Sequence, residues 1–153
     1  MSLRNTLTTD LKSAMRAQEK MRLKTLRLIQ TEIKRADIAL KTDGKGDEID
    51  EPAILALLQK MIKQRQDTIK IYLDKGRDAA ADAESQEIAV IEDYLPKMKS
   101  QAQTQALIAA TIADLGAEGM KDMGKVIGAL KAAHPGALDM GLTSSLVKAA
   151  LGA

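Results

Sequence analysis

The near absence of aromatic side chains constrains the fold of this chain more than any other feature of its sequence. Its 153 residues include no Phe, no Trp and only two Tyr, yet 45% of them are hydrophobic. A hydrophobic core must therefore be built mainly from Ala, Leu, Ile and Met, most of which favour helices. Val and the aromatic residues, which strands favour, are scarce. The composition predicts an all-helical (all-α) protein.

The spacing of the apolar residues predicts seven helices in two domains. Between residues 26 and 40, apolar side chains recur after alternately three and four positions, which is the period of an amphipathic helix. Similar stripes, separated by Gly, Pro and short polar segments, mark six further helices. Pro96 ends the fourth helix. We therefore expect an N-terminal domain resembling a four-helix bundle (residues 1–96), followed by a small three-helix C-terminal domain (residues 97–153).

Some helix ends are predicted by single residues. Residues 17–20 interrupt the first apolar stripe although they include neither Gly nor Pro. Ser100, Asp122 and Asp139 are residue types that favour helix N-caps, and we expect them to begin the last three helices. Asp122 and Asp139 each start a copy of the repeated Asp-Met-Gly, so the repeat marks two helix starts.

Several classes of site are excluded or disfavoured by composition. The absence of Cys excludes disulfides, thiol catalysis and thiolate metal sites. The single histidine, His134, has no clustered acidic residues around it and is a poor metal ligand set. No apolar run approaches the roughly 20 residues of a membrane span, and the first residues do not resemble a signal peptide. We therefore expect a cytoplasmic protein without a catalytic residue, a cofactor, a metal or a membrane partner.

The net charge of +2 conceals basic and acidic blocks. Residues 1–43 carry ten basic and five acidic residues, a net charge of +5, whereas residues 79–96 have a net charge of −5. In the basic block, five cations follow one face of the second helix, about 130° from its apolar stripe. This basic stripe is either an ordinary solvated helix face or a track for nucleic-acid phosphates. It consists of Lys20, Lys24, Arg27, Lys34 and Lys41.

One charged residue is predicted to point into the core. Arg65 lies within the apolar arc of the third helix, and Glu84 lies within that of the fourth. A charge directed at a core must be paired or must reach solvent along its aliphatic stem. We expect Arg65 to pair with Glu84 or Glu87 and to fix the register of the two helices, which is a structural and not a catalytic role.

The segment DMGKVIGALKAAHPGALDMG (122–141) holds four of the ten glycines and the only histidine. It is not a phosphate-binding loop, because the required Gly-Lys-Ser/Thr is absent. Gly124 and Gly128 each cost about 1 kcal/mol inside a helix, and close contact between helices is the expected reason. His134 and Gly136 end the helix. The alternative is a docking surface in which lysines and exposed backbone hold a phosphate. Those lysines are Lys121, Lys125, Lys131 and Lys148.

Residues 121–151 (KDMGKVIGALKAAHPGALDMGLTSSLVKAAL) resemble the C-terminal signature of the YqeY-like family, and residues 23–34 and 76–96 resemble its N-terminal bundle. The family is similar to the tail domain of the tRNA-dependent amidotransferase that makes Gln-tRNA or Asn-tRNA. A similar module is appended to some glutaminyl-tRNA synthetases. The resemblance implies a helical module that grips the body of a tRNA, without catalysis, which in the amidotransferase belongs to a large cradle domain. The family signature falls on Gly124, Gly128, Lys131, Gly136, Leu146, Val147 and Lys148.

We therefore expect a non-catalytic module that binds the backbone or shape of tRNA, or that binds a tRNA-handling enzyme such as an aminoacyl-tRNA synthetase or the amidotransferase. The basic stripe is a second candidate surface. Two alternatives stay open. One is an accessory protein that binds another protein without RNA, and the other is a carbon–nitrogen ligase with glutamine as amide donor, an activity that homology would attach to the family. The expected docking residues are Lys121, Gly124, Lys125, Gly128, Lys131, His134, Gly136 and Lys148.

Overall fold

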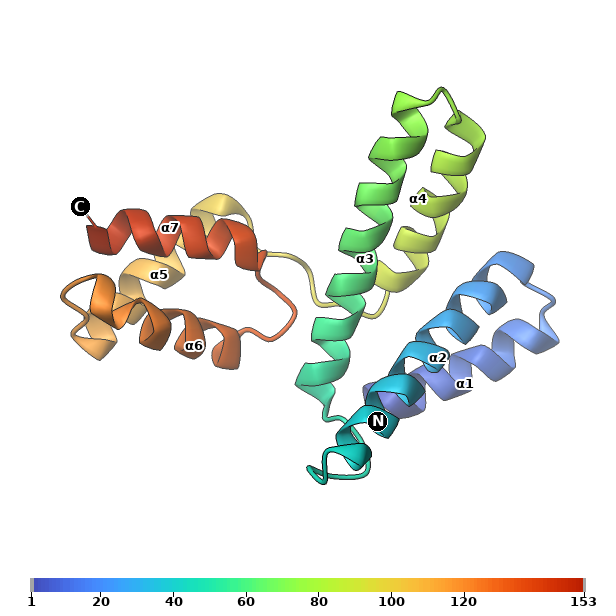
Figure 1. Cartoon of the computed structure of the whole chain (residues 1–153), viewed down its shortest axis with the longest axis horizontal. Coiled ribbons are helices and arrows are strands. Elements are labelled where there is room, and N and C mark those ends of the chain that lie inside the picture. The colour runs from blue at the N-terminus through green and yellow to red at the C-terminus, as the bar shows by residue number, and fades with distance from the viewer. Residues whose placement is uncertain (1, 153) are drawn as a thin grey trace. The chain divides into compact units, whose positions relative to one another are not determined.

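The computed structural model describes residues 2–152, and all of the secondary structure in this range is helical (Figure 1). The prediction of an all-helical protein is therefore confirmed. The elements are α1 (Leu3–Arg16), α2 (Lys20–Thr42), α3 (Glu51–Asp74), α4 (Asp78–Glu92), α5 (Gln101–Leu115), the 3₁₀ turn η1 (Met120–Asp122), α6 (Met123–Ala133) and α7 (Met140–Gly152).

Side-chain caps define the starts of four helices. Ser2, Asp50 and Ser100 each accept a hydrogen bond, 2.9 to 3.2 Å long, from the backbone N–H three residues further along the chain. Asp139 accepts two such bonds at the start of α7, 3.0 and 3.1 Å long. These bonds satisfy N–H groups that the first helical turn leaves without a partner. Asp122 behaves differently from the prediction, because its carboxylate accepts from the Glu118 N–H (3.0 Å) and makes no capping bond to α6.

The break between α1 and α2 occurs without Gly or Pro. Gln18 adopts a left-handed backbone conformation with φ of 57°, which costs an L-residue about 1–2 kcal/mol. The reversal lets α1 fold back on α2, so that the fully buried Leu7 lies in one core with Leu26 and Ile29. The burial of these side chains offsets the cost of the turn.

The chain divides into two compact units, one extending to Leu95 and the other beginning at Pro96. In the first unit, the core takes residues of α3 only as far as Ile62 and residues of α4 only from Val90 onward. The distal part of the α3–α4 hairpin therefore projects beyond the α1–α2 hairpin (Figure 1). The buried core residues of this unit are Leu7, Ala14, Leu26, Ile29, Ile33, Ile54, Leu58, Met61, Ile91 and Tyr94.

The second unit contains α5, η1, α6 and α7 around a smaller core. Its α6–α7 turn is fastened to the segment that precedes α5, because the Lys99 N–H donates to the Ala137 carbonyl oxygen at 2.8 Å. Gly136 takes a positive φ of 75° within this turn. The buried apolar residues at the centre of the unit are Ile108, Val126, Leu130, Leu138, Val147 and Leu151.

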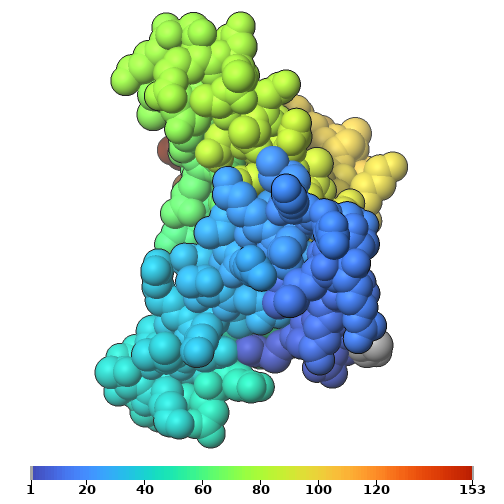
Figure 2. Space-filling model, turned by 90° about the vertical axis from the view of Figure 1, so that its right-hand side faces the viewer, coloured from blue at the N-terminus to red at the C-terminus, as the bar shows by residue number. Residues whose placement is uncertain are grey.

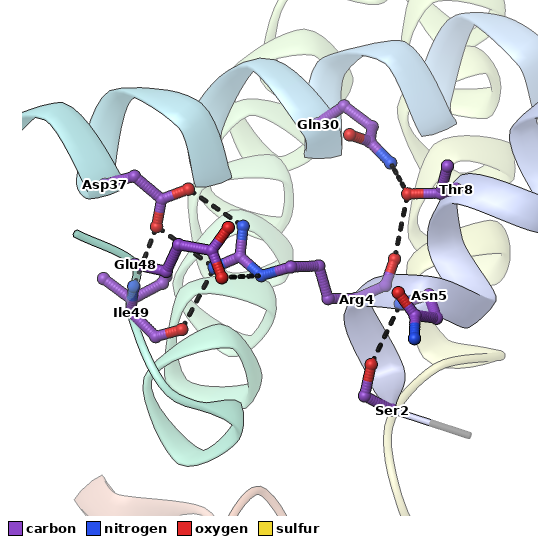
Figure 3. A network of polar contacts seen from close by, with 8 residues as sticks. All are labelled: Ser2, Arg4, Asn5, Thr8, Gln30, Asp37, Glu48 and Ile49. Carbon is purple, nitrogen blue, oxygen red and sulfur yellow. Dashed lines mark hydrogen bonds and ion pairs between the residues drawn. The ribbon is translucent and has the colours of Figure 1, made fainter.

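A charged network fastens the loop between α2 and α3 to the start of α1 (Figure 3). Arg4 donates to both carboxylate oxygens of Asp37 (2.9 and 3.1 Å) and to the carbonyl oxygen of Ile49 (3.0 Å). The Ile49 N–H donates to Asp37 Oδ1 at 2.8 Å. The hydrogen bond from Arg4 holds the pKa of the Asp37 carboxyl below its usual value, and the Ile49 N–H acts in the same direction.

We expect this network to contribute stability that disappears in acid. Because the pKa of Asp37 is lowered in the folded state, its contribution is present above the unfolded pKa of about 3.9 and is lost as the pH falls through the lower folded pKa. Urea unfolding between neutral and acidic pH should show Asp37→Asn less stable than the wild type at pH 7, with a difference that shrinks in acid. A difference that does not change with pH would contradict this assignment.

Candidate nucleic-acid interface

Gly124 and Gly128 lie on the exposed side of α6, away from the core of the second unit. The buried residues of this helix, Val126 and Leu130, point to the opposite side, as a period of 3.6 residues requires. A Cβ atom added to either glycine meets no neighbouring atom within 4 Å. The predicted close helix–helix contact at these glycines is therefore wrong, because α5 and α7 cover the other face of α6.

Two lysines flank the exposed glycines. With about 100° per residue, Lys125 lies about 60° to one side of Gly128 and Lys131 about 60° to the other. Both side chains are exposed. The strip therefore has bare backbone along its centre and a flexible cation along each edge. We call the surface formed by Gly124, Lys125, Gly128 and Lys131 the glycine–lysine face.

The other predicted docking residues have different positions. Lys121 is exposed in η1, immediately before α6, whereas Lys148 is exposed on α7. His134 ends α6: its N–H donates to the Leu130 carbonyl oxygen at 2.9 Å, and its own carbonyl oxygen accepts from the Ala137 N–H at 3.2 Å. The structure thus places His134 and Gly136 in the α6–α7 turn. Within residues 2–152, none of the four lysines of this group forms an ion pair.

The open space at the glycines predicts that alanine stabilises the protein there. Gly124→Ala and Gly128→Ala are each expected to raise the free energy of unfolding by about 1 kcal/mol, because alanine favours the helix and meets no neighbour. Urea denaturation measures the change. As a control, Gly116→Ala, at a helix end with φ of 63°, is expected to destabilise. Destabilisation by the α6 substitutions would mean that another part of the protein does pack on this face.

The basic stripe lies on the exposed surface of α2, but the protein's own acidic residues neutralise part of it. Lys24 Nζ lies 3.2 Å from Glu87 Oε1, and Lys41 Nζ lies 3.5 Å from Asp47 Oδ1. Lys20, Arg27 and Lys34 form no ion pair with any residue that the structure describes. The stripe is therefore not a continuous row of free cations, and the glycine–lysine face is the clearer candidate for binding phosphate.

Arg65 is paired with Glu87 between α3 and α4. Arg65 Nε lies 2.9 Å from Glu87 Oε2, and Arg65 Nη1 donates to the carbonyl oxygen of Met61 at 3.1 Å. Lys24 of α2 holds the other oxygen of Glu87, which is only 5% exposed. Glu84, the other predicted partner, is half-buried and makes no ion pair with a described residue. This group joins three helices and contacts no open site, which is a structural role.

A second buried polar group was not predicted from the sequence. The Tyr94 hydroxyl donates to Asp10 Oδ2 at 2.6 Å and accepts from Arg22, which also binds Asp93 at 2.9 Å. Burial raises the pKa of Tyr94, and the hydrogen bond to Asp10 raises it further. The hydroxyl therefore stays protonated and links α1, α2 and the end of α4. A single Tyr just before Pro96, in a chain almost without aromatic residues, was the available signal.

Two searches of residues 2–152 concern other kinds of site. They contain no group of three or more acidic or histidine side chains arranged to hold a metal ion. None of their helices combines the length and the apolar character needed to cross a membrane.

An all-helical chain with an exposed glycine–lysine face on its sixth helix is the class that these observations define. The family model described as "Yqey-like protein" matches residues 4–151, so the chain belongs to the YqeY-like family. The family resemblance drawn from the sequence is thus confirmed.

Named relatives come from yeasts. The chain is similar to "Altered inheritance of mitochondria protein 41, mitochondrial" of Lachancea thermotolerans, with 33% identity over 111 residues, 71% of this chain and 57% of the relative. The protein of the same name from Meyerozyma guilliermondii is 36% identical over 103 residues, 66% of this chain and 51% of the relative. The chain therefore spans about half the length of the curated relatives it matches. The expectation of a cytoplasmic protein is wrong on this comparison, because these relatives are named as mitochondrial proteins.

Proposed function

We propose that the chain is a non-catalytic module with a four-helix N-terminal domain and a three-helix tail, and that the tail binds tRNA through the glycine–lysine face. The observation that carries the proposal is the open space at Gly124 and Gly128, beside lysines without an internal ion-pair partner. Two exposed glycines weaken α6 and serve no packing role within their own unit. Their presence is explained if another molecule must approach the helix backbone closely.

Phosphate is the chemistry that best fits this face. A glycine leaves room for a sugar-phosphate backbone against the helix, and a lysine on each side can reach a phosphate oxygen. Both tyrosines, Tyr72 and Tyr94, belong to the first unit, so the second unit has no aromatic side chain on which a base could stack. Recognition is therefore expected to depend on the backbone and shape of the RNA and not on its bases. The resemblance to the amidotransferase tail favours tRNA as this RNA.

A titration of the chain against total tRNA at about 50 and about 200 mM salt tests the proposal. If Lys121, Lys125 and Lys131 each contact one phosphate, affinity should fall roughly 20-fold between the two conditions, because each contact releases counterions. Filter binding or a mobility shift gives the two dissociation constants. No binding at micromolar protein, or binding that salt does not weaken, would exclude this function.

A protein partner on the same face is the second candidate. Met120, in η1 beside Lys121, is 44% exposed, and Leu115 at the end of α5 is 45% exposed. These apolar side chains favour a protein surface more than an RNA backbone. Gly128→Leu discriminates the two, since the added side chain meets no atom of this chain. In nuclease-treated extract, this candidate predicts that the wild type retains a protein that the variant loses. The ligase alternative predicts glutamine- or ATP-dependent activity of the isolated chain, and we expect none.

A further inference from the structure

The projecting part of the α3–α4 hairpin carries an acidic groove. The groove has a volume of about 310 Å³ and lies outside the core of the first unit. Its apolar wall includes Leu73, which is 53% exposed. Asp78 and Asp82 are its charged residues, and no cation lines it. The residues that form this acidic groove are Ile69, Leu73, Asp78, Ala79, Ala81, Asp82 and Ser85.

The N-terminal half of α2 carries a basic groove of similar size, with a volume of about 400 Å³. Its apolar wall includes Leu28, which is 37% exposed. Three cations line it and no acidic residue does. Lys20 and Arg27 have no ion-pair partner among the described residues, and Lys24 is shared with Glu87. The residues that form this basic groove are Lys20, Leu23, Lys24, Arg27, Leu28 and Thr31.

The two grooves are complementary, yet no ion pair joins them within one copy among the described residues. Each has exposed leucine, and each has charges of one sign that are opposite to those of the other. Figure 2 shows the surface of α1 and α2 in blue and the end of the α3–α4 hairpin in green on the same face of the first unit. A single partner can therefore reach both α2 and the hairpin end.

We propose that this partner is a second copy of the chain, bound reciprocally. The acidic groove at the hairpin end of each copy contacts the basic groove on α2 of the other. A two-fold axis forms every contact twice, so a modest pairing of charges and leucines is doubled. The commitment to a second copy rests on the charges, because the chain itself carries the acidic, leucine-bearing surface that its own basic groove lacks.

A charge swap tests this arrangement in the full chain by sedimentation velocity. We expect the wild type to shift from monomer to dimer as its concentration rises, with a weaker shift in high salt. Lys20→Glu/Arg27→Glu and Asp82→Lys/Ser85→Lys should each be monomeric, because like charges then face each other. Mixing the two variants should restore a dimer that contains one copy of each. Asp78 is left intact because a carboxylate in the first turn stabilises α4.

Two controls keep the outcome decisive. Lys34→Glu/Lys45→Glu makes the same change in net charge outside the basic groove and should dimerise like the wild type. Circular dichroism of each variant shows whether it is folded. A wild type that stays monomeric up to roughly 300 µM, a range that covers weak interfaces, overturns the proposal. Folded variants that stay monomeric when mixed overturn it as well.

Discussion

Replacing Glu87 by alanine is expected to lower the free energy of unfolding by about 3 kcal/mol, the lower end of the range for breaking a buried ion pair. In the wild type, the carboxylate lies 2.9 Å from Arg65 Nε and 3.2 Å from Lys24 Nζ. Without it, Arg65, whose side chain is 13% exposed, keeps its hydrogen bond to the Met61 carbonyl oxygen and little else. Lys24 is largely exposed and can turn to water, which keeps the loss from being larger.

Urea denaturation of three variants separates this effect from a general cost of mutation. Glu84→Ala is the matched control, since Glu84 lies on the same helix without an ion pair to a described residue, and its cost should stay below about 0.5 kcal/mol. Replacing both charges, as Arg65→Met with Glu87→Leu, should recover most of the loss, because an apolar pair leaves no buried charge unpaired. If Glu87→Ala costs no more than Glu84→Ala, the pair does not support the packing of α2, α3 and α4.

Reversing Lys125 and Lys131 to glutamate is expected to weaken tRNA binding about 100-fold. A lysine about 4 Å from a phosphate gains about 1 kcal/mol in water, so reversing its charge costs up to about 2 kcal/mol, and salt screening reduces the total for two sites. Each tenfold change corresponds to about 1.4 kcal/mol. Both residues are exposed and unpaired within residues 2–152, so the fold should be unaffected.

The matched control for this variant is Lys12→Glu with Lys45→Glu. It makes the same change in net charge with two exposed lysines of the first unit. Mobility-shift titrations of the two double variants and the wild type at one salt concentration give the comparison. Equal weakening in both variants would mean that net charge, and not the glycine–lysine face, controls binding.

Local signals in the sequence predicted much of the helical structure. Ser100 begins α5 with a capping bond, and the break at residues 17–20 was visible from the interrupted apolar stripe. These features depend on residues close together in the chain. The same reasoning failed at Asp122, whose carboxylate binds the Glu118 N–H of the preceding loop instead of α6. That choice depends on the path of residues 116–119, which no periodic pattern describes.

The candidate site depended on tertiary packing, and the sequence could predict it only in part. It identified the glycines and lysines of residues 121–148 but could not tell which side of α6 faces the core, so Gly124 and Gly128 were assigned to helix contacts. In the same way, Glu84 and Glu87 were both acceptable partners for Arg65. The structure joins Arg65 to Glu87, which Lys24 of α2 also reaches, and a contact between three helices cannot be read from the spacing along one.

The most direct test of the central claim is the salt dependence of tRNA affinity, measured for the wild type and for Lys125→Ala with Lys131→Ala. If the glycine–lysine face contacts phosphates, the slope of log affinity against log salt should become shallower by about 1.5 to 2 in the variant, because each lost contact removes about 0.7 to 0.9. A variant with the wild-type slope would contradict the account, since these two lysines would then contact no phosphate.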